Sequence, residues 1–264
     1  MLEHKVIGNA MQQVVCQVAQ GQTVYGEPGK FVWKTPNMTL ETRLTAPQGN
    51  QAGAPPAKAG FLQKAMDVGK RALAGEHLAF QYFTPVGGSG LVTFAGVVPG
   101  EVRALELTSE GGWLTERGSF VAAEAGVNFD IAFTGLRTGL RSGQGFVLEK
   151  FSGAGTLLIA AAGNFIELNP SKYGGKIQAH TGCVVAFEDS LTFNVERVGG
   201  LNAQTAMTAI FGGEGINLVT LEGDGIVLLQ SVTIEALAHA IEPHLAAPGE
   251  ERKGGLGGIL EGRL

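Results

Sequence analysis

The sequence has few of the features that mark secreted or membrane-spanning proteins. Only two of its 264 residues are cysteines, Cys16 and Cys183, and both lie in apolar segments. They allow at most one disulfide bond and form no Cys-x-x-Cys pair, so reduced, buried thiols are preferred over a disulfide or a metal site. No apolar run reaches the about 18 residues that cross a bilayer, and no signal-like segment opens the chain. We therefore expect a soluble, cytoplasmic protein without a transmembrane segment.

Positive charge is also in short supply. Nineteen Lys and Arg residues against 24 Asp and Glu residues give a net charge of −5. Because neutralisation of phosphates dominates affinity for nucleic acid, this balance argues against a nucleic-acid partner. The candidate basic residues do not recur from one part of the chain to the next, and we interpret them as a solvated helix face: Lys58, Lys64, Lys70, Arg71, Arg137 and Arg141.

Motifs for catalysis and metal binding are missing as well. Ser119 and Ser171 lie in no Gly-x-Ser-x-Gly motif. The carboxylates Glu124, Glu188 and Asp189 follow apolar segments and are interpreted as residues of solvated turns rather than as an acid–base pair. The histidines are too scattered for a ligand set and are interpreted as surface residues: His4, His77, His180, His239 and His244. We expect no catalytic residue, no cofactor and no metal, and hence no enzyme.

Glycine, by contrast, is abundant, with 41 residues, and it recurs in a pattern. GSGLVTFA at 88–95 returns as GAGTLLIA at 153–160 and as GDGIVLLQ at 223–230, each after a strand-like run. Strands on both sides predict antiparallel hairpins rather than phosphate-binding loops, which need a helix after the glycines. Glycine would supply the positive φ of these turns. The predicted turn glycines are Gly29, Gly90, Gly118, Gly155, Gly182 and Gly225.

A second segment recurs with the first. GSFVAAE at 118–124 matches GCVVAFE at 182–188, and the third counterpart, GKFVW at 29–33, stands near the start of the chain. The sequence thus predicts an all-β unit over 1–245 that contains three modules, approximately 61–133, 134–198 and 199–236 completed by 5–45. In this scheme the N-terminal strands pair with strands around 212–234, which removes open sheet edges.

Three segments are expected to lie outside the strands. Residues 46–60 are rich in Pro, Gly and Ala and predict a flexible loop, and 246–264 predict a mobile glycine-rich tail. Apolar residues at helical spacing predict a short helix over 61–74, whose apolar face packs on its own module or, as a second choice, on another subunit. That face comprises Phe61, Leu62, Ala65, Met66 and Leu73. The segment IEALAHAIEPHL predicts one or two helical turns before Pro243.

The order of these segments, from GEPGKFVW through RGSFVAAE and TGCVVAFE to GDGIVLLQS, resembles a known family over about residues 5 to 245. It is the family named for altered inheritance of mitochondria, at its twenty-fourth locus. Its members are mostly bacterial proteins of unknown function, with a domain similar to the tryptophan RNA-binding attenuation protein (TRAP). The resemblance implies three TRAP-like modules per chain, each a short double-stranded β-helix, with pseudo-threefold symmetry, and three chains in a ring of nine modules. It brings no active site.

These observations favour a non-enzymatic, ring-forming scaffold or binding protein over an enzyme. We expect a homotrimer that organises larger complexes with an unidentified protein partner. The alternative is a protein that binds nucleic acid or a small ligand between the modules of the ring.

Overall fold

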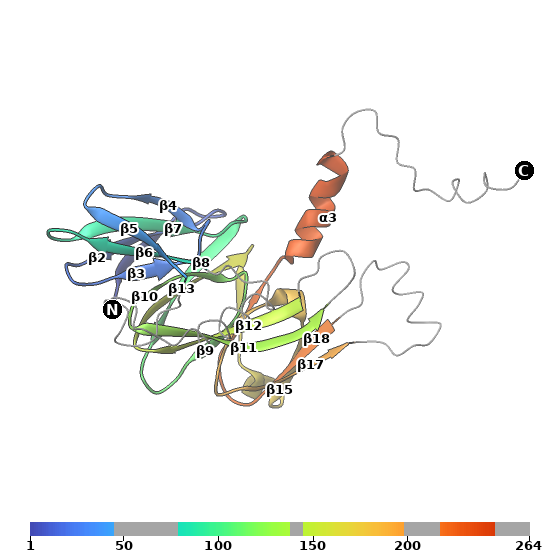
Figure 1. Ribbon diagram of the computed structural model, residues 1–264. Coiled ribbons are helices and arrows are strands. Elements are labelled where there is room, and N and C mark those ends of the chain that lie inside the picture. The colour runs from blue at the N-terminus through green and yellow to red at the C-terminus, as the bar shows by residue number, and fades with distance from the viewer. Residues whose placement is uncertain (45–78, 138–144, 198–216, 246–264) are drawn as a thin grey trace, which may run out of the picture.

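The described chain is nearly all β-strand. The computed structural model describes residues 1–44, 79–137, 145–197 and 217–245 (Figure 1). Its first sheet has the order β1 (Glu3–Ile7), β2 (Gln13–Val18), β7 (Gly90–Ala95), β4 (Phe31–Lys34). Its fourth has the order β15 (Lys176–His180), β18 (Asn217–Glu222), β17 (Thr192–Arg197). The all-β expectation is confirmed.

Two six-stranded sheets lie between these in the pairing scheme. The second sheet has the order β5 (Met38–Arg43), β6 (Phe80–Pro85), β3 (Val24–Gly26), β10 (Phe120–Glu124), β13 (Gly155–Ala162), β8 (Gly100–Leu107). The third has the order β11 (Val127–Arg137), β12 (Gly145–Gly153), β9 (Trp113–Glu116), β16 (Val184–Glu188), β19 (Val227–Gln230), β14 (Phe165–Leu168). Short 3₁₀ segments, η2 (Pro170–Tyr173) and η3 (Thr181–Cys183), flank β15.

The same pairing order returns every six strands. We call β2–β7, β8–β13 and β14–β19 the first, second and third strand sets. Within them the orders β2-β7-β4, β8-β13-β10 and β14-β19-β16 correspond, as do β5-β6-β3, β11-β12-β9 and β17-β18-β15. Each set also carries a register shift at the same place, which lies between Phe31 and Trp33, Phe120 and Ala122, and Val184 and Ala186. A bulge bends a strand and increases its twist, so each set turns in the same way.

The predicted pairing between the two ends of the chain is wrong. Strands β18 and β19 pair with β14 to β17 of their own set. The N-terminal strands β2 to β5 instead pair with β1, β6, β7 and β10. The third set is therefore not completed by residues 5–45. Sequence similarity identifies which strands are equivalent, but it does not say which copy of a partner strand each one joins.

The glycine turns are flanked by strands, as expected, but they are not hairpins. Strands β6 and β7 lie in different sheets, and so do β12 and β13, and β18 and β19. Each turn therefore carries the chain from one sheet into another. Of the six predicted glycines, only Gly29 (φ +92°) and Gly155 (φ +144°) have a positive φ, so the reason given for Gly90, Gly118, Gly182 and Gly225 is wrong. At Gly90 a side-chain carbon would run into Sδ of Met38, so space is the constraint there.

Three hydrophobic clusters fill the spaces between successive sheets. The first and second sheets share one, the second and third share an aromatic-rich one, and the third and fourth share the last. The two middle sheets therefore bury both faces. This explains why β10 and β16 read as continuous apolar runs, FVAA and VVAF, instead of alternating apolar and polar residues.

The helix α3 (Ile234–Leu245) stands away from the β-strands (Figure 1). It is longer than the predicted one or two turns and continues through Pro243, ending two residues later. Proline has no backbone N–H to donate, so Pro243 removes one hydrogen bond of the helix, close to its C-terminal end. Other predictions fall outside the described residues: the 46–60 loop, the 61–74 helix, the 246–264 tail, His77, and the side chains of the candidate basic residues.

Candidate functional site

Two internal junctions join the three strand sets. At the first, β3 pairs antiparallel with β10, and Gly26 lies opposite Ala122. At the second, β9 pairs with β16 in the equivalent register, and Thr115 lies opposite Ala186. Each junction thus joins the second strand of one set, β3 or β9, to the third strand of the next set, β10 or β16, by backbone hydrogen bonds.

At the two ends of the row of strand sets, β4 and β15 each have an edge without a described partner strand. In the part of the chain that the structure describes, β4 pairs only with β7, whereas its counterparts β10 and β16 each have a second partner. Trp33 holds the register position of Ala122 and Ala186. Its side chain is 41% exposed, and the neighbouring Val32 is 49% exposed, whereas the two alanines are completely buried. The edge of β4 therefore exposes a surface that the other two sets bury.

The other open edge belongs to β15. Among the described residues β15 pairs only with β18, whereas its counterparts β3 and β9 also pair with β10 and β16. Gln178 at the centre of this edge is exposed, and Ile177 is half-buried. Unpaired strand edges are templates for pairing with another chain, so both edges are candidate interaction sites.

The carboxylates predicted to lie in solvated turns instead cap backbone groups. Glu124 is only 9% exposed, and its Oε2 accepts a hydrogen bond of 2.7 Å from the backbone N of Thr156. Glu188 accepts in the same way from Ile226, at 3.0 Å. The interpretation as solvated residues is therefore wrong for these two. Asp189 is partly exposed, and its pKa is lowered by Lys150, which lies 2.9 Å from Oδ2, and by the N–H of Gly112.

Replacing Glu124 with alanine is expected to lower the free energy of unfolding by about 1–2 kcal/mol, because it leaves the buried N–H of Thr156 without its acceptor. Urea-induced unfolding of the full chain measures this. Glu124→Gln is the matched control, since the amide oxygen can still accept the bond. Equal losses for the two variants would show that the hydrogen bond is not the reason.

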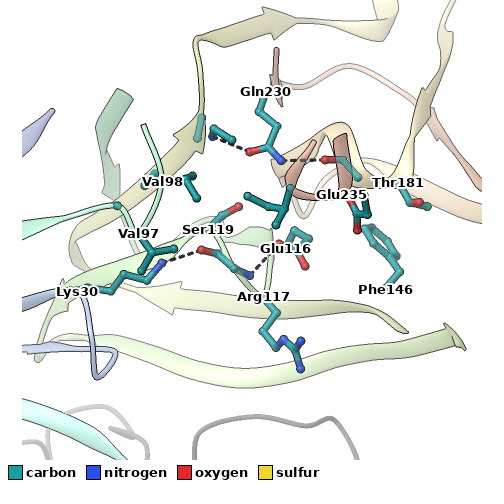
Figure 2. Close-up of a pocket in the computed structure, with 17 residues that line it drawn as sticks. Lys30, Val97, Val98, Glu116, Arg117, Ser119, Phe146, Thr181, Gln230 and Glu235 are labelled. Atoms are coloured by element: carbon teal, nitrogen blue, oxygen red, sulfur yellow. Dashed lines mark hydrogen bonds between the residues drawn. The ribbon is translucent and has the colours of Figure 1, made fainter. Parts of the chain in front are cut away.

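A cavity of about 290 Å³ lies where turns from all three sets meet the start of α3 (Figure 2). Lys30 comes from the β3–β4 turn, Glu116 from the end of β9, Ser119 from the β9–β10 turn, and Thr181 from the β15–β16 turn. Ile234 and Glu235 of α3 also line it. The cavity was not foreseen from the sequence. Its only signal was that these turns occupy equivalent positions in the repeated segments.

Four charged side chains line the cavity: Lys30, Arg117, Glu116 and Glu235. Lys30 is 4% exposed, and its Nζ donates to the carbonyl of Gly118 at 2.9 Å and lies 3.8 Å from Oε2 of Glu27. Burial lowers the pKa of Lys30. Burial also raises the pKa of the half-buried Glu116 to about 7, against the hydrogen bond that its Oε2 accepts from the N of Gly118 at 2.8 Å. Glu235 raises this pKa further.

The remaining candidate residues are not brought together. Ser119 is buried in the cavity wall, whereas Ser171 is exposed within η2. His239 and His244 are exposed on α3, and Nδ1 of the half-buried His180 accepts from the N of Gly182. Cys16 is buried, as expected, and burial raises its thiol pKa to about 12. Cys183 is only half-buried, so the expectation of a buried thiol is wrong there; both thiols are free.

The strands, the two open edges and the cavity can now be compared with a known protein family. A family described as mitochondrial biogenesis AIM24 matches residues 4–232, which include β2 to β19 and all of β1 except Glu3. The chain belongs to the AIM24 family. The match includes both open edges and every turn that lines the cavity, and it ends just before α3.

Two proteins of Streptococcus pyogenes are similar to this AIM24 chain. An uncharacterized protein of serotype M6 is 28% identical over 255 residues, covering 92% of this chain and 94% of that protein. The crystal structure of another S. pyogenes protein has a TM-score of 0.68 at 24% identity, covering 93% of this chain and all of that chain. This likeness supports the fold of the AIM24 chain and says nothing of its ligands.

Two features are absent from the described part of the AIM24 chain. No helix there is both long enough and apolar enough to cross a membrane. No group of three or more His, Cys, Asp or Glu residues in the described ranges is arranged to hold a metal ion.

Proposed function

We propose that this AIM24 protein is a non-enzymatic scaffold that assembles into a ring, with β15 of one copy paired to β4 of the next. The observation that carries the proposal is the pair of open edges. Each internal junction joins β3 or its counterpart β9 to β10 or β16, which are the counterparts of β4. Among the described strands, β15 (the third counterpart of β3) and β4 itself lack such a partner. Head-to-tail contacts of this sort close into rings when the rotation between copies allows it.

The internal junctions also supply the register of the proposed contact. Ala122 faces Gly26, and Ala186 faces Thr115. The register positions that correspond to these pairs place Trp33 opposite Ala179 of the next copy. The next position places Lys34 opposite Gln178, which corresponds to the pairs Ala123–Tyr25 and Phe187–Leu114. In this contact the exposed Val32 and Trp33 become buried, as their counterparts are.

Each strand set would then be one module of the short double-stranded β-helix type found in TRAP. Three copies of the chain would give a homotrimer of nine modules with a repeated junction throughout. Such a ring presents identical surfaces around its circumference, which suits a role in organising larger complexes. The recurrence of strand order and bulge position in the three sets supports this module assignment.

A register-specific disulfide tests the contact. In a Cys183→Ser background, the pair Lys34→Cys and Gln178→Cys is expected to form disulfides between copies on oxidation, because facing residues place their Cβ atoms about 4.5–5.5 Å apart. Non-reducing electrophoresis should show a ladder that ends at three chains. Lys34→Cys with Lys176→Cys, two residues out of register, is the control. Equal cross-linking of both pairs, or of neither, would overturn the proposed register.

Disruption of the β4 edge gives an independent measurement. Trp33→Glu is expected to convert a species of three times 27.4 kDa into a single chain in native mass spectrometry, because it buries a charge at the junction. Leu40→Glu replaces an equally exposed apolar residue, 44% against 41%, on a strand outside the contact, and should leave the assembly intact. A monomeric parent protein would remove the ring. A species heavier than the protein alone, together with absorbance at 260 nm in the same preparation, would favour the nucleic-acid alternative.

Cys183 offers a second readout of the same assembly. It corresponds to Lys30 and Ser119, both of which are buried against neighbouring turns. In the ring it would face the next copy's β3–β4 turn, so thiol reagents should react with it much faster in Trp33→Glu than in the parent. Cys16 is buried within its own set and should stay unreactive in both.

A further inference from the structure

Helix α3 carries an apolar stripe that is mostly exposed, because the helix stands away from the strands (Figure 1). The stripe recurs at helical spacing and comprises Ile234, Leu237, Ile241 and Leu245. Ile234 is 47% exposed, Ile241 43% and Leu245 77%, and only Leu237 is half-buried. Because most of the stability of a helix in a protein comes from packing its apolar face, this stripe lacks the cover that such a helix needs.

The place where α3 begins is defined by the starts of the three strand sets, which lie side by side. Met11, shortly before β2, forms a parallel bridge with Gly100 at the start of β8, and Gly100 forms another with Gly163, shortly before β14. Backbone hydrogen bonds accompany both bridges, from the N of Gln12 to the carbonyl of Gly100 at 2.9 Å and from the N of Glu101 to the carbonyl of Gly163 at 3.0 Å. We call Met11, Gly100 and Gly163 the row of strand starts.

A polar side chain reinforces each step of this row. Oε1 of Gln12 accepts a hydrogen bond of 2.9 Å from the N of Val102 in the second set. Oε2 of Glu101 accepts one of 2.8 Å from the N of Phe165 in the third set. Each set therefore holds the start of the next one through the residue that follows its own bridged position.

The helix stands at the end of the row that lies beyond the third set. There the N of Asn164 donates to Oγ of Ser231 at 2.9 Å, and the N of Val232 donates to the carbonyl of Ala162. A hollow of about 480 Å³ at this end is lined by Val232 and Leu237 together with residues beside all three strand starts. At the two internal boundaries the corresponding side of the row is occupied by the next set, so α3 begins where a further set would follow.

The opposite end of the row exposes a methionine. Within the described ranges Met11 is bridged to Gly100 alone, whereas Gly100 is bridged on both sides. The side chain of Met11 is 71% exposed, and Asn9 and Ala10 in the same β1–β2 turn are exposed as well. One end of the row thus carries an apolar helix face, and the other carries an exposed apolar residue on a turn.

We propose that the apolar stripe of α3 packs on the β1–β2 turn of the next copy of this chain, with Ile241 against Met11. The inference rests on the proposed ring, because the contact between β15 and β4 is what places the first set of one copy after the third set of another. It adds a second contact, made by side chains at the strand starts, that the strand pairing does not require. Helix α3 is then a clamp that each copy places on its neighbour.

Hydrogen exchange along α3 tests whether another copy covers the stripe. In the assembled parent the amides of residues 234–245 are expected to exchange at least about tenfold more slowly than in dissociated Trp33→Glu, because a helix without a packed face opens easily. Trp33 lies on β4, so this variant leaves every side chain of α3 unchanged. Equal exchange in an assembled parent and in the dissociated variant would overturn the clamp and leave the ring in place. A parent that is a single chain would remove the ring, and the clamp with it.

Alanine variants test the assigned partner residue. Ile241→Ala keeps a strong helix former and is expected to raise the concentration at which half of the assembly dissociates by about tenfold or more. His239→Ala, on the other side of the helix, is the control and should leave that concentration unchanged. Met11→Ala should act like Ile241→Ala, and the double variant should be little worse than either, because both changes remove the same contact. Effects of the two variants that multiply, or an effect of His239→Ala equal to that of Ile241→Ala, would overturn the assignment.

Discussion

Replacing Phe151 with alanine is expected to lower the free energy of unfolding by about 3–5 kcal/mol. Phe151 is completely buried in the aromatic cluster between the second and third sheets. It stacks on Phe120 with ring centroids 4.8 Å apart and meets Phe129 edge-on at 5.5 Å. Alanine loses the transfer free energy of the ring and leaves a cavity among strands of two sheets, which cannot collapse without moving both.

Guanidinium-induced unfolding of the full chain measures this loss. Phe151→Leu keeps most of the apolar volume and should cost less than about 1.5 kcal/mol. Ile166→Ala removes an apolar side chain that is 43% exposed and should cost less still. If Phe151→Ala unfolds at the same denaturant concentration as Ile166→Ala, the ring is not part of a shared core.

Valine in place of Gly100 is expected to cost about 3 kcal/mol, for a different reason. Gly100 lies between two backbone segments, because it bridges in parallel to Met11 and to Gly163. A side-chain carbon there would run into the carbonyl oxygen of Ala161 and lie 2.9 Å from the N of Gly163. Both obstacles are backbone atoms, so no side-chain rotation relieves the clash.

The matched control is Gly111→Val. A side-chain carbon on Gly111 meets nothing within 4 Å, so this variant should change the free energy of unfolding by less than about 0.5 kcal/mol. The difference in melting temperature between the two valine variants is the measurement. Similar melting temperatures would mean that the backbones near Gly100 can separate at little cost.

The sequence supported the equivalence of strands far better than their pairing. The matching segments GKFVW, GSFVAAE and GCVVAFE contain β4, β10 and β16, which hold corresponding places in the strand orders. Their similarity could not show that β4 belongs with β6 and β7, because a repeated unit can be divided at more than one point and still give the same pattern. Strand partners depend on contacts through space, and glycine turns between apolar runs occur both in hairpins and in turns that change sheets.

The sites were hidden for a related reason. Glu124 follows an apolar segment, which suggests solvent, yet its partner Thr156 lies 32 residues away in the sequence. The cavity gathers Lys30, Glu116 and Glu235 from three distant segments, and none of them carries a local motif. In the sequence, Trp33 is indicated only as one residue of the apolar segment GKFVW. Its importance arises from comparison with Ala122 and Ala186, whose burial only the structure reveals.

The two middle sheets, which bury both of their faces, make the strand sets interdependent. The second set contributes side chains to the cluster that it shares with the first set and to the cluster that it shares with the third set. A fragment containing one set alone would expose apolar surface on strands such as β10 that have no polar face to turn toward water. Deletion of any one strand set would therefore leave apolar side chains of the remaining sets exposed to water, unless another polypeptide covered them.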